Sequence, residues 1–324
     1  TKPYDEASFN DKNKEYGFEL RYYKGHLNKH NVILTQNVDA VCIFVNDTAD
    51  AEVLHMMADN GVKLLALRCA GYNNVDLKAA ADCGITVVRV PAYSPYAVAE
   101  YTVALMLSLN RKIPRATWRT RDGNFSLHGL LGFDMYGKTV GIIGTGKIAK
   151  KLIMILRGFG MNVLAYDLYP DYNFAREHQV VYTTLDELYH SSDIISLHCP
   201  LTEQTKYLIN DYSISKMKEG VMIINTGRGQ LIHTNALIEG LKNKKIGSAG
   251  LDVYEEEGEY FYEDQSDRII DDDVLARLLS FNNVIVTSHQ AFFTREALEN
   301  IATTTLQNIK DFASGKALEN EVKI

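Results

Sequence analysis

The chain has 324 residues, of which 46% are hydrophobic and 23% charged, a composition that suits a globular protein of about two domains. A formal net charge of −7 without a basic cluster argues against nucleic-acid binding, and no apolar run approaches the roughly 18 residues of a membrane span. The four cysteines, Cys42, Cys69, Cys83 and Cys199, lack the spacing of a metal site and predict reduced thiols in a cytoplasmic protein.

Helices and strands alternate in the first third of the chain. The pattern predicts helix 2–16, strands 18–23 and 40–45, helix 51–60, strand 64–67, helix 75–82 and strand 86–90. This alternation indicates a small doubly wound parallel sheet. Such a domain normally begins with a strand, and none precedes the first helix. We therefore expect about 5–8 further residues before Thr1 in the natural protein, forming that strand.

A long helix follows the first domain. Ser94-Pro95 predicts a helix N-cap and first helical residue, and the helix runs to about Arg111. We interpret it as the connector to a second domain. The basic run Arg111–Arg121 covers an acidic surface of this chain or of a partner subunit, or else is a solvated face; the sequence leaves both open.

Residues 138–167 form the most informative stretch of the sequence. Thr139–Ile143 predicts a buried parallel strand, and Gly144-Thr145-Gly146 predicts a turn into a helix that begins at Lys147. A second strand, residues 162–166, ends at Asp167. This βαβ unit carries the dinucleotide-binding fingerprint, with Ala149 in place of the third glycine.

The fingerprint predicts a nucleotide site with defined chemistry. Gly146 lets the helix N-terminus approach a pyrophosphate, whose charge the exposed N–H groups stabilise. Asp167 is placed to accept hydrogen bonds from the adenosine ribose and would repel a 2′-phosphate, while Leu168 and Tyr169 offer no arginine. The sequence therefore predicts NAD rather than NADP. The alternative for the glycines alone is a tight turn without a ligand.

The remaining elements complete a second domain. They are helix 184–190, opened by a predicted capping box from Thr184 to Glu187, strands 193–198 and 221–225, helix 234–243, strands 246–253 and 284–287, and helix 294–314. We expect the last helix to return to the first domain. The prediction is thus a discontinuous substrate (catalytic) domain, residues 1–94 plus 294–324, and an NAD-binding Rossmann domain, residues 95–293.

Polar residues follow the predicted strands of the second domain. Because ligands of an open parallel sheet bind beyond the carboxyl ends of its strands, Arg228, Glu257 and His289 should converge there. An arginine offers a planar fork to a carboxylate, a histidine exchanges protons near neutral pH, and a neighbouring glutamate fixes the histidine tautomer and favours its charged form. Beside a nicotinamide, these groups suffice to reduce a 2-keto acid.

Each of these residues also has a structural interpretation. Arg228 between two glycines could bridge surface acids, and His289 at a strand end could be a core histidine bonded to backbone. Glu257 lies in a run of three glutamates that alone would indicate a solvated segment. The functional interpretation rests on the three occurring together at strand ends.

Four motifs in this order resemble the D-isomer-specific 2-hydroxyacid dehydrogenases over essentially the whole chain. They are VGIIGTGKIA from Val140, NTGRGQLI from Asn225, GLDVYEEE from Gly250 and SHQAFFT from Ser288. The resemblance implies an α/β protein with two doubly wound parallel-sheet domains, a Rossmann NAD-binding domain and a flavodoxin-like substrate domain. The segment Tyr254–Asp273, which holds ten acids, also matches; its alternative is a solvated loop with an aromatic anchor.

The resemblance also implies residue roles. Arg228, Glu257 and His289 would be catalytic, and RCAGYNN from Arg68 with VPAYSP from Val90 would form the substrate loop and pocket. The implied cofactor-binding residues are Gly144, Gly146, Lys147, Ile148, Asp167, Cys199, Pro200, Thr205, Thr226, Gly227 and Asp252. The implied substrate-binding residues are Ala70 and Gly71, through their N–H groups, with Tyr93 and Phe292.

The implied activity is the reversible, NADH-dependent reduction of pyruvate to D-lactate. We expect no metal, because Arg228 supplies the electrophilic charge, and a homodimer or homotetramer formed around the helix after Ser94. Two alternatives stay open: a reductase of a larger 2-keto acid, and an NADH-sensing transcriptional corepressor without turnover.

Overall fold

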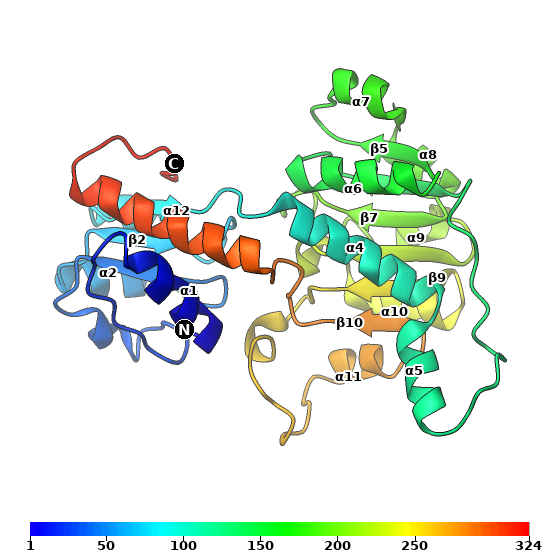
Figure 1. Cartoon of the computed structure of the whole chain (residues 1–324), viewed down its shortest axis with the longest axis horizontal. Coiled ribbons are helices and arrows are strands. Elements are labelled where there is room, and N and C mark those ends of the chain that lie inside the picture. Colours follow the sequence, from blue (N-terminus) through cyan, green and yellow to red (C-terminus); the bar gives the residue numbers. More distant parts are fainter. Residues whose placement is uncertain (324) are drawn as a thin grey trace. The chain divides into compact units, whose positions relative to one another are not determined.

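The computed structural model describes residues 1–323, and Ile324, the last residue of the predicted substrate domain, lies outside the described residues. The chain divides into two compact units (Figure 1). Unit 1 contains Thr1–Ser94 and the described residues from Phe293 onward, and unit 2 is Pro95–Phe292. Both units are α/β with parallel sheets, so the predicted fold class is confirmed.

Unit 2 is built on a seven-stranded parallel sheet with the order β10-β9-β8-β7-β4-β5-β6. Its strands are β4 (Thr139–Ile143), β5 (Asn162–Tyr166), β6 (Val180–Tyr182), β7 (Ile194–Leu197), β8 (Val221–Asn225), β9 (Ile246–Leu251) and β10 (Val284–Val286). The chain moves outward in one direction from β4 to β6 and then returns to the other side of β4 at β7. This reversal is the topological switch point of a Rossmann fold.

Helices cover both faces of this sheet. On one face α4 and α6 pack side by side (Figure 1), and Leu105, Met106, Leu152 and Leu156 are buried between them and the strands. The helices of unit 2 are α4 (Pro95–Asn110), α5 (Ile113–Arg121), α6 (Lys147–Gly158), α7 (Tyr172–His178), α8 (Leu185–Ser191), α9 (Asp211–Lys216), α10 (Thr234–Lys242) and α11 (Asp273–Leu279), with 3₁₀ turns η2 (Gly229–Leu231) and η3 (Glu257–Glu259). Residues of α8 to α11 form a second core on the other face.

Unit 1 contains a parallel sheet of three strands among the described residues, in the order β1-β2-β3. Its elements are α1 (Pro3–Asn13), η1 (Val32–Thr35), β1 (Ala40–Ile43), α2 (Ala51–Asp59), β2 (Leu64–Leu67), α3 (Leu77–Asp82), β3 (Thr86–Arg89) and α12 (Arg295–Ala313). Ile309 and Phe312 of α12 pack on Leu64 and Val88, so the C-terminal helix covers this sheet. No helix in the described part of the chain is long and apolar enough to cross a membrane.

The strand predicted for residues 18–23 is wrong. Phe18, Leu20 and Tyr22 are half-buried while the residues between them are exposed, so the two-residue period is real. The backbone there nevertheless forms no strand and joins neither sheet of the described residues. Periodicity reports which face is buried, and a strand also needs a neighbour to accept its N–H groups.

Besides helix α5 and the 3₁₀ turns, four short elements were not predicted: α7, β6, α9 and α11. Three of them carry cap residues that could have indicated them. Asp171, Asn210 and Asp272 each accept a hydrogen bond from the first turn of the helix that follows. The capping box predicted at Thr184 is only half formed. The Thr184 hydroxyl accepts a hydrogen bond from the Glu187 N–H, but the Glu187 carboxylate accepts one from the Ser191 hydroxyl and not from the Thr184 N–H.

Candidate active site

The residues predicted to act in unit 2 all follow the carboxyl ends of its strands. Gly144 follows β4, Asp167 follows β5, and Cys199 lies just beyond β7. Arg228, Glu257 and His289 come after β8, β9 and β10, which are adjacent strands. Because the sheet is entirely parallel, these positions share one edge, with the switch point between β4 and β7.

The glycine turn has the geometry that a nucleotide phosphate site requires. Gly144 has a φ of +91°, and a Cβ at this position would lie 2.5 Å from the backbone nitrogen of Cys199. Gly146 is the N-cap of α6, and a Cβ there would meet nothing within 4 Å. The helix N-terminus is therefore open to an approaching anion, with Lys147 exposed on its first turn and Ile148 partly buried.

Asp167 is oriented by three hydrogen bonds. Its Oδ2 accepts from the N–H (2.5 Å) and hydroxyl (2.9 Å) of Thr145, and its Oδ1 accepts from the Tyr169 N–H at 2.9 Å. Partial burial raises the pKa of this carboxyl, but the bonds from Tyr169 and Thr145 outweigh it, and the net pKa is lowered. Asp167 is thus a fixed carboxylate at the end of β5, which fits the ribose of NAD.

The loop after β7 runs past the glycine turn. Cys199 is half-buried, and burial raises the pKa of its thiol to about 11. Thr205 closes the loop by donating to the Pro200 carbonyl at 2.6 Å. The neighbouring His198, which sequence reasoning missed, lies 2.8 Å from the Ser196 hydroxyl, and burial lowers its pKa to about 4. His198 is therefore a neutral structural residue at neutral pH.

Arg228 is held in a tight loop after β8. The Asn225 side chain accepts from the Gly227 N–H at 3.0 Å and donates to the Arg228 carbonyl at 2.9 Å. The guanidinium itself donates to the Gly227 carbonyl at 2.8 Å. Nearby, the buried Thr226 hydroxyl is 3.1 Å from that of Thr102. The loop backbone is thus fixed by a side chain of the strand that precedes it.

Gly229 brings this loop against the loop after β9. A Cβ at Gly229 would overlap the Tyr254 carbonyl and would lie 2.6 Å from the Glu255 nitrogen. The two backbones are in contact, and only glycine leaves room for that. This contact places Arg228 beside the segment that carries Glu257.

Glu257 and His289 form a direct pair. The Glu257 Oε1 lies 2.9 Å from the His289 Nδ1, and the side chains are 25% and 15% exposed. The other oxygen, Oε2, accepts from the Tyr254 N–H at 3.1 Å. With Nδ1 committed to the carboxylate, Nε2 is the nitrogen left for exchange with a ligand. The Tyr262 hydroxyl donates to the His289 carbonyl at 3.3 Å.

Asp252 organises the backbone around His289. Its side chain is fully buried and accepts from the Thr287 hydroxyl (2.6 Å) and from the N–H groups of Gln290 (2.9 Å) and Ala291 (2.8 Å). Burial raises the pKa of this carboxyl, although these bonds and the imidazole oppose the rise. His289 has a φ of +54°, a strained conformation for a residue with a side chain. The Asp252 bonds hold the loop in it.

The predicted substrate residues divide between the units. Phe292 is buried in unit 2, whereas Ala70, Gly71 and Tyr93 belong to unit 1. In unit 1 the Ala70 carbonyl accepts from the guanidinium of Arg89 at 2.9 Å, and the Tyr93 carbonyl accepts from the Asn300 amide at 2.7 Å. The backbone positions expected to hold a carboxylate are thus anchored from within their own unit.

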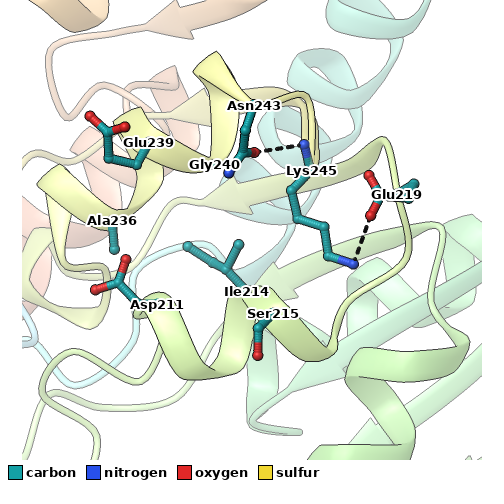
Figure 2. A pocket seen from close by; sticks show the side chains of 9 residues that line it. All are labelled: Asp211, Ile214, Ser215, Glu219, Ala236, Glu239, Gly240, Asn243 and Lys245. Atoms are coloured by element: carbon teal, nitrogen blue, oxygen red, sulfur yellow. Dashed lines mark hydrogen bonds and ion pairs between the residues drawn. The ribbon is translucent and has the colours of Figure 1, made fainter.

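A separate cavity of about 270 Å³ lies between α9 and α10 (Figure 2). In Figure 2 the Lys245 ammonium, which bonds Glu219 at 3.1 Å, lies at one end of it. Lys245 directly precedes β9 and Glu219 lies two residues before β8, so the cavity is at the opposite edge of the sheet from the predicted site. It is lined by Asp211, Ile214, Ser215, Glu219, Ala236, Glu239, Gly240, Asn243 and Lys245.

Comparison with known proteins gives the class. The family model for the D-isomer specific 2-hydroxyacid dehydrogenase, NAD binding domain, matches residues 103–291. The chain belongs to this family, and its cofactor is NAD. The open helix N-terminus after Gly146 and the fixed carboxylate of Asp167 suit that cofactor.

Individual relatives match nearly the full chain. A 2-hydroxyacid dehydrogenase homolog of Haemophilus influenzae is 54% identical over 99% of this chain and 97% of its own length. The D-lactate dehydrogenase of Escherichia coli is 52% identical over 99% and 98%. The apo-structure of the Escherichia coli enzyme superposes with a TM-score of 0.91, at 50% identity, over 100% of this chain and 98% of that chain.

Proposed function

We propose that this protein catalyses the reversible reduction of pyruvate to D-lactate by NADH. The observation that carries the proposal is the 2.9 Å pair of Glu257 and His289 on the sheet edge that also bears Arg228 and the dinucleotide fingerprint. The similarity to a protein named D-lactate dehydrogenase supports pyruvate as the 2-keto acid.

Each member of the trio has one task in this proposal. Arg228 binds the substrate carboxylate and polarises the keto oxygen, because its guanidinium presents two parallel donors. His289 donates the proton to that oxygen from Nε2, and Glu257 stabilises the imidazolium that donates it. When bound, NADH supplies the hydride that adds to the keto carbon. In the reverse direction His289 accepts the hydroxyl proton.

The other predicted residues have binding roles in this proposal. Lys147 and Ile148 flank the pyrophosphate, and Asp252 with the backbone of Thr226 and Gly227 lies at the nicotinamide end. On the adenosine side the proposed contacts are Cys199, Pro200 and Thr205. The N–H groups of Ala70 and Gly71 bind the substrate carboxylate in this proposal, and Tyr93 and Phe292 each have a substrate-binding role. Residues 1–94 plus 294–324 would thus form the substrate domain and residues 95–293 the NAD-binding domain.

A steady-state assay tests the proposal. Purified protein is supplied with pyruvate and either NADH or NADPH, and the product is resolved on a chiral column. We expect turnover with NADH and D-lactate as the product. Arg228→Gln should weaken pyruvate binding by about 1.5–3 kcal/mol, the value of a charged hydrogen bond. His289→Gln should lower turnover about 10²–10⁴-fold by removing the proton donor.

The same assay separates the alternatives. Phenylpyruvate and hydroxypyruvate, run beside pyruvate, reveal a reductase of a larger 2-keto acid if either has the higher kcat/KM. NADH binding without turnover of any keto acid would indicate a sensor and would refute the proposal. Near-normal turnover by His289→Gln would show that another group donates the proton.

We also propose that the protein is a homo-oligomer in the cytoplasm. The segment from α5 to β4 exposes an unusual number of large apolar side chains, which marks an interaction surface. The most exposed are Trp118 (67%), Phe125 (75%), Leu127 (83%), Leu131 (88%) and Tyr136 (80%). Light scattering after size exclusion gives the subunit number. The chain has one tryptophan, so a change in Trp118 emission on dilution would report dissociation directly.

A further inference from the structure

We propose that Arg89 is a positioning residue for substrate binding, acting through the peptide bond between Ala70 and Gly71. The inference rests on the proposed function, in which these two N–H groups bind the substrate carboxylate. It adds the side chain that orients the second of them, the Gly71 N–H, and that places a positive charge beside its peptide.

Arg89 is itself rigidly held. It is the last residue of β3 and pairs in register with Leu67, the last residue of β2, whose chain continues into the loop. Its N–H donates to the Asn320 carbonyl at 3.0 Å, and its carbonyl accepts from the Asn308 amide at 3.0 Å. The side chain therefore starts from a fixed backbone beside the loop that it contacts.

The guanidinium determines which way one peptide faces. Arg89 Nη1 donates to the Ala70 carbonyl at 2.9 Å, and the guanidinium lies 5.2 Å from the centre of the Tyr72 ring. In a trans peptide the C=O of one residue and the N–H of the next point in opposite directions. Because the Ala70 oxygen faces Arg89, the Gly71 N–H faces away from it.

These amides have the properties of an anion site. Within the described residues, the N–H groups of Ala70 and Gly71 have no hydrogen-bond acceptor, although both residues are half-buried. The next carbonyl of the loop, that of Gly71, accepts from the Cys69 thiol at 3.3 Å. The carbonyls of Ala70 and Gly71 thus both have donors, whereas the two N–H groups stay available to a ligand.

The charges around the loop distinguish Arg89 from its neighbour Arg68. Arg68 is buried and forms an ion pair with Asp5 at 2.8 Å, so its charge is compensated. Arg89 has no carboxylate partner among the described residues. Its positive charge is therefore available to an incoming anion, and it also polarises the peptide whose N–H would bind that anion.

Arg89→Gln, Arg89→Lys and a matched control, Arg21→Gln, test the inference. Arg21 is an exposed arginine of the same unit, whose guanidinium pairs with Glu19. For Arg89→Gln we expect the KM for pyruvate to rise about 10-fold, with kcat falling less than about 3-fold and the Kd for NADH unchanged. Arg89→Lys should recover part of the loss, because lysine keeps the charge and one donor. Arg21→Gln should behave like the wild type.

A neutral substrate separates positioning from mere support of the fold. The ratio of kcat/KM for pyruvate to that for pyruvamide reports recognition of the carboxylate, and Arg89→Gln should reduce this ratio several-fold. Equal losses on both substrates, or an unchanged KM, would overturn the inference even if the wild type reduces pyruvate normally. A wild type that reduces no 2-keto acid would overturn the proposed function, and this inference with it.

Discussion

We expect Gly229→Ala to inactivate the enzyme, although the substitution alters no side chain that binds a ligand. The added methyl would overlap the carbonyl of Tyr254 and approach the Glu255 nitrogen to 2.6 Å. Both obstacles are backbone atoms, so no side-chain rotation relieves them. The loop that carries Arg228 would have to separate from the loop that carries Glu257.

The size of the effect follows from that separation. A Cβ needs at least about 3 Å from such atoms, so the two loops must part by about 1 Å, and a displacement of this size costs about 10²-fold in rate. Overpacking of this kind also costs about 1–3 kcal/mol of folding free energy. The fingerprint glycines and Asp167 lie on other strands, so binding of ADP-ribose should be preserved.

The assay combines three measurements. These are kcat/KM for pyruvate, calorimetric binding of ADP-ribose, and the midpoint of urea unfolding. Gly158→Ala is the matched control, because Gly158 is an exposed helical glycine whose Cβ would meet nothing within 4 Å. It should keep full activity and gain up to about 1 kcal/mol of stability. A kcat/KM for Gly229→Ala within about threefold of the wild type would refute the claim that loop contact positions Arg228.

Three further outcomes follow from the site. Burial lowers the pKa of His198 in the folded protein to about 4, whereas an unfolded histidine has a pKa of about 6.5. As the pH falls below about 6.5, the unfolded chain therefore binds a proton that the folded protein does not. The free energy of unfolding should then drop by up to about 1.4 kcal/mol per pH unit. Urea unfolding at pH 7, 6 and 5 should show a flatter dependence for His198→Asn; parallel curves would contradict this. Asp167→Asn should reduce the preference for NADH over NADPH about 10- to 100-fold in fluorescence titrations, and an unchanged ratio would remove Asp167 from the ribose site. Burial raises the pKa of the Cys199 thiol to about 11, so iodoacetamide should alkylate this cysteine slowly at pH 8 and faster as the pH rises. Peptide mapping measures the labelling, and bound NADH should slow it. Rapid labelling at pH 8 would be inconsistent with a buried thiol.

Short strands with a mainly apolar sequence were predictable to the residue. Residues 64–67, 139–143, 162–166 and 221–225 form strands with the expected limits, because a short apolar run between turn residues is typical of a strand inside a parallel sheet. Residues 18–23 show that a strand-like pattern of buried residues is not sufficient to form a strand. Their alternation survives in the structure, but strand formation depends on a partner that local sequence does not specify.

The edge of the sheet at which the site lies and the pairing of Glu257 with His289 were also predictable, but the contacts that hold the loops in place were not. Parallel strands bring Arg228, Glu257 and His289 to one edge of the sheet regardless of the conformation of the loops. In the structure the His289 Nδ1 lies 2.9 Å from the Glu257 Oε1. The contact of Gly229 with Tyr254 depends on loop paths that no periodicity encodes. The bond from Arg89 to the Ala70 carbonyl is equally invisible, since an arginine at a strand end has many acceptors within reach.

The residues that position this site share one chemical property: each of them forms hydrogen bonds with the backbone of a functional loop. Asp252 binds the N–H groups around His289, the Asn225 amide closes the Arg228 loop, and Arg89 binds a carbonyl of the substrate loop. Loops that carry functional groups have few backbone partners of their own, so their conformation must come from buried side chains or from glycine contacts. Substitution of a residue that contacts the ligand therefore reports its role in binding or proton transfer, whereas substitution of Gly229 or Arg89 reports how the loops are positioned. The effects of the two kinds of substitution on activity should be markedly non-additive where both residues act on the same loop.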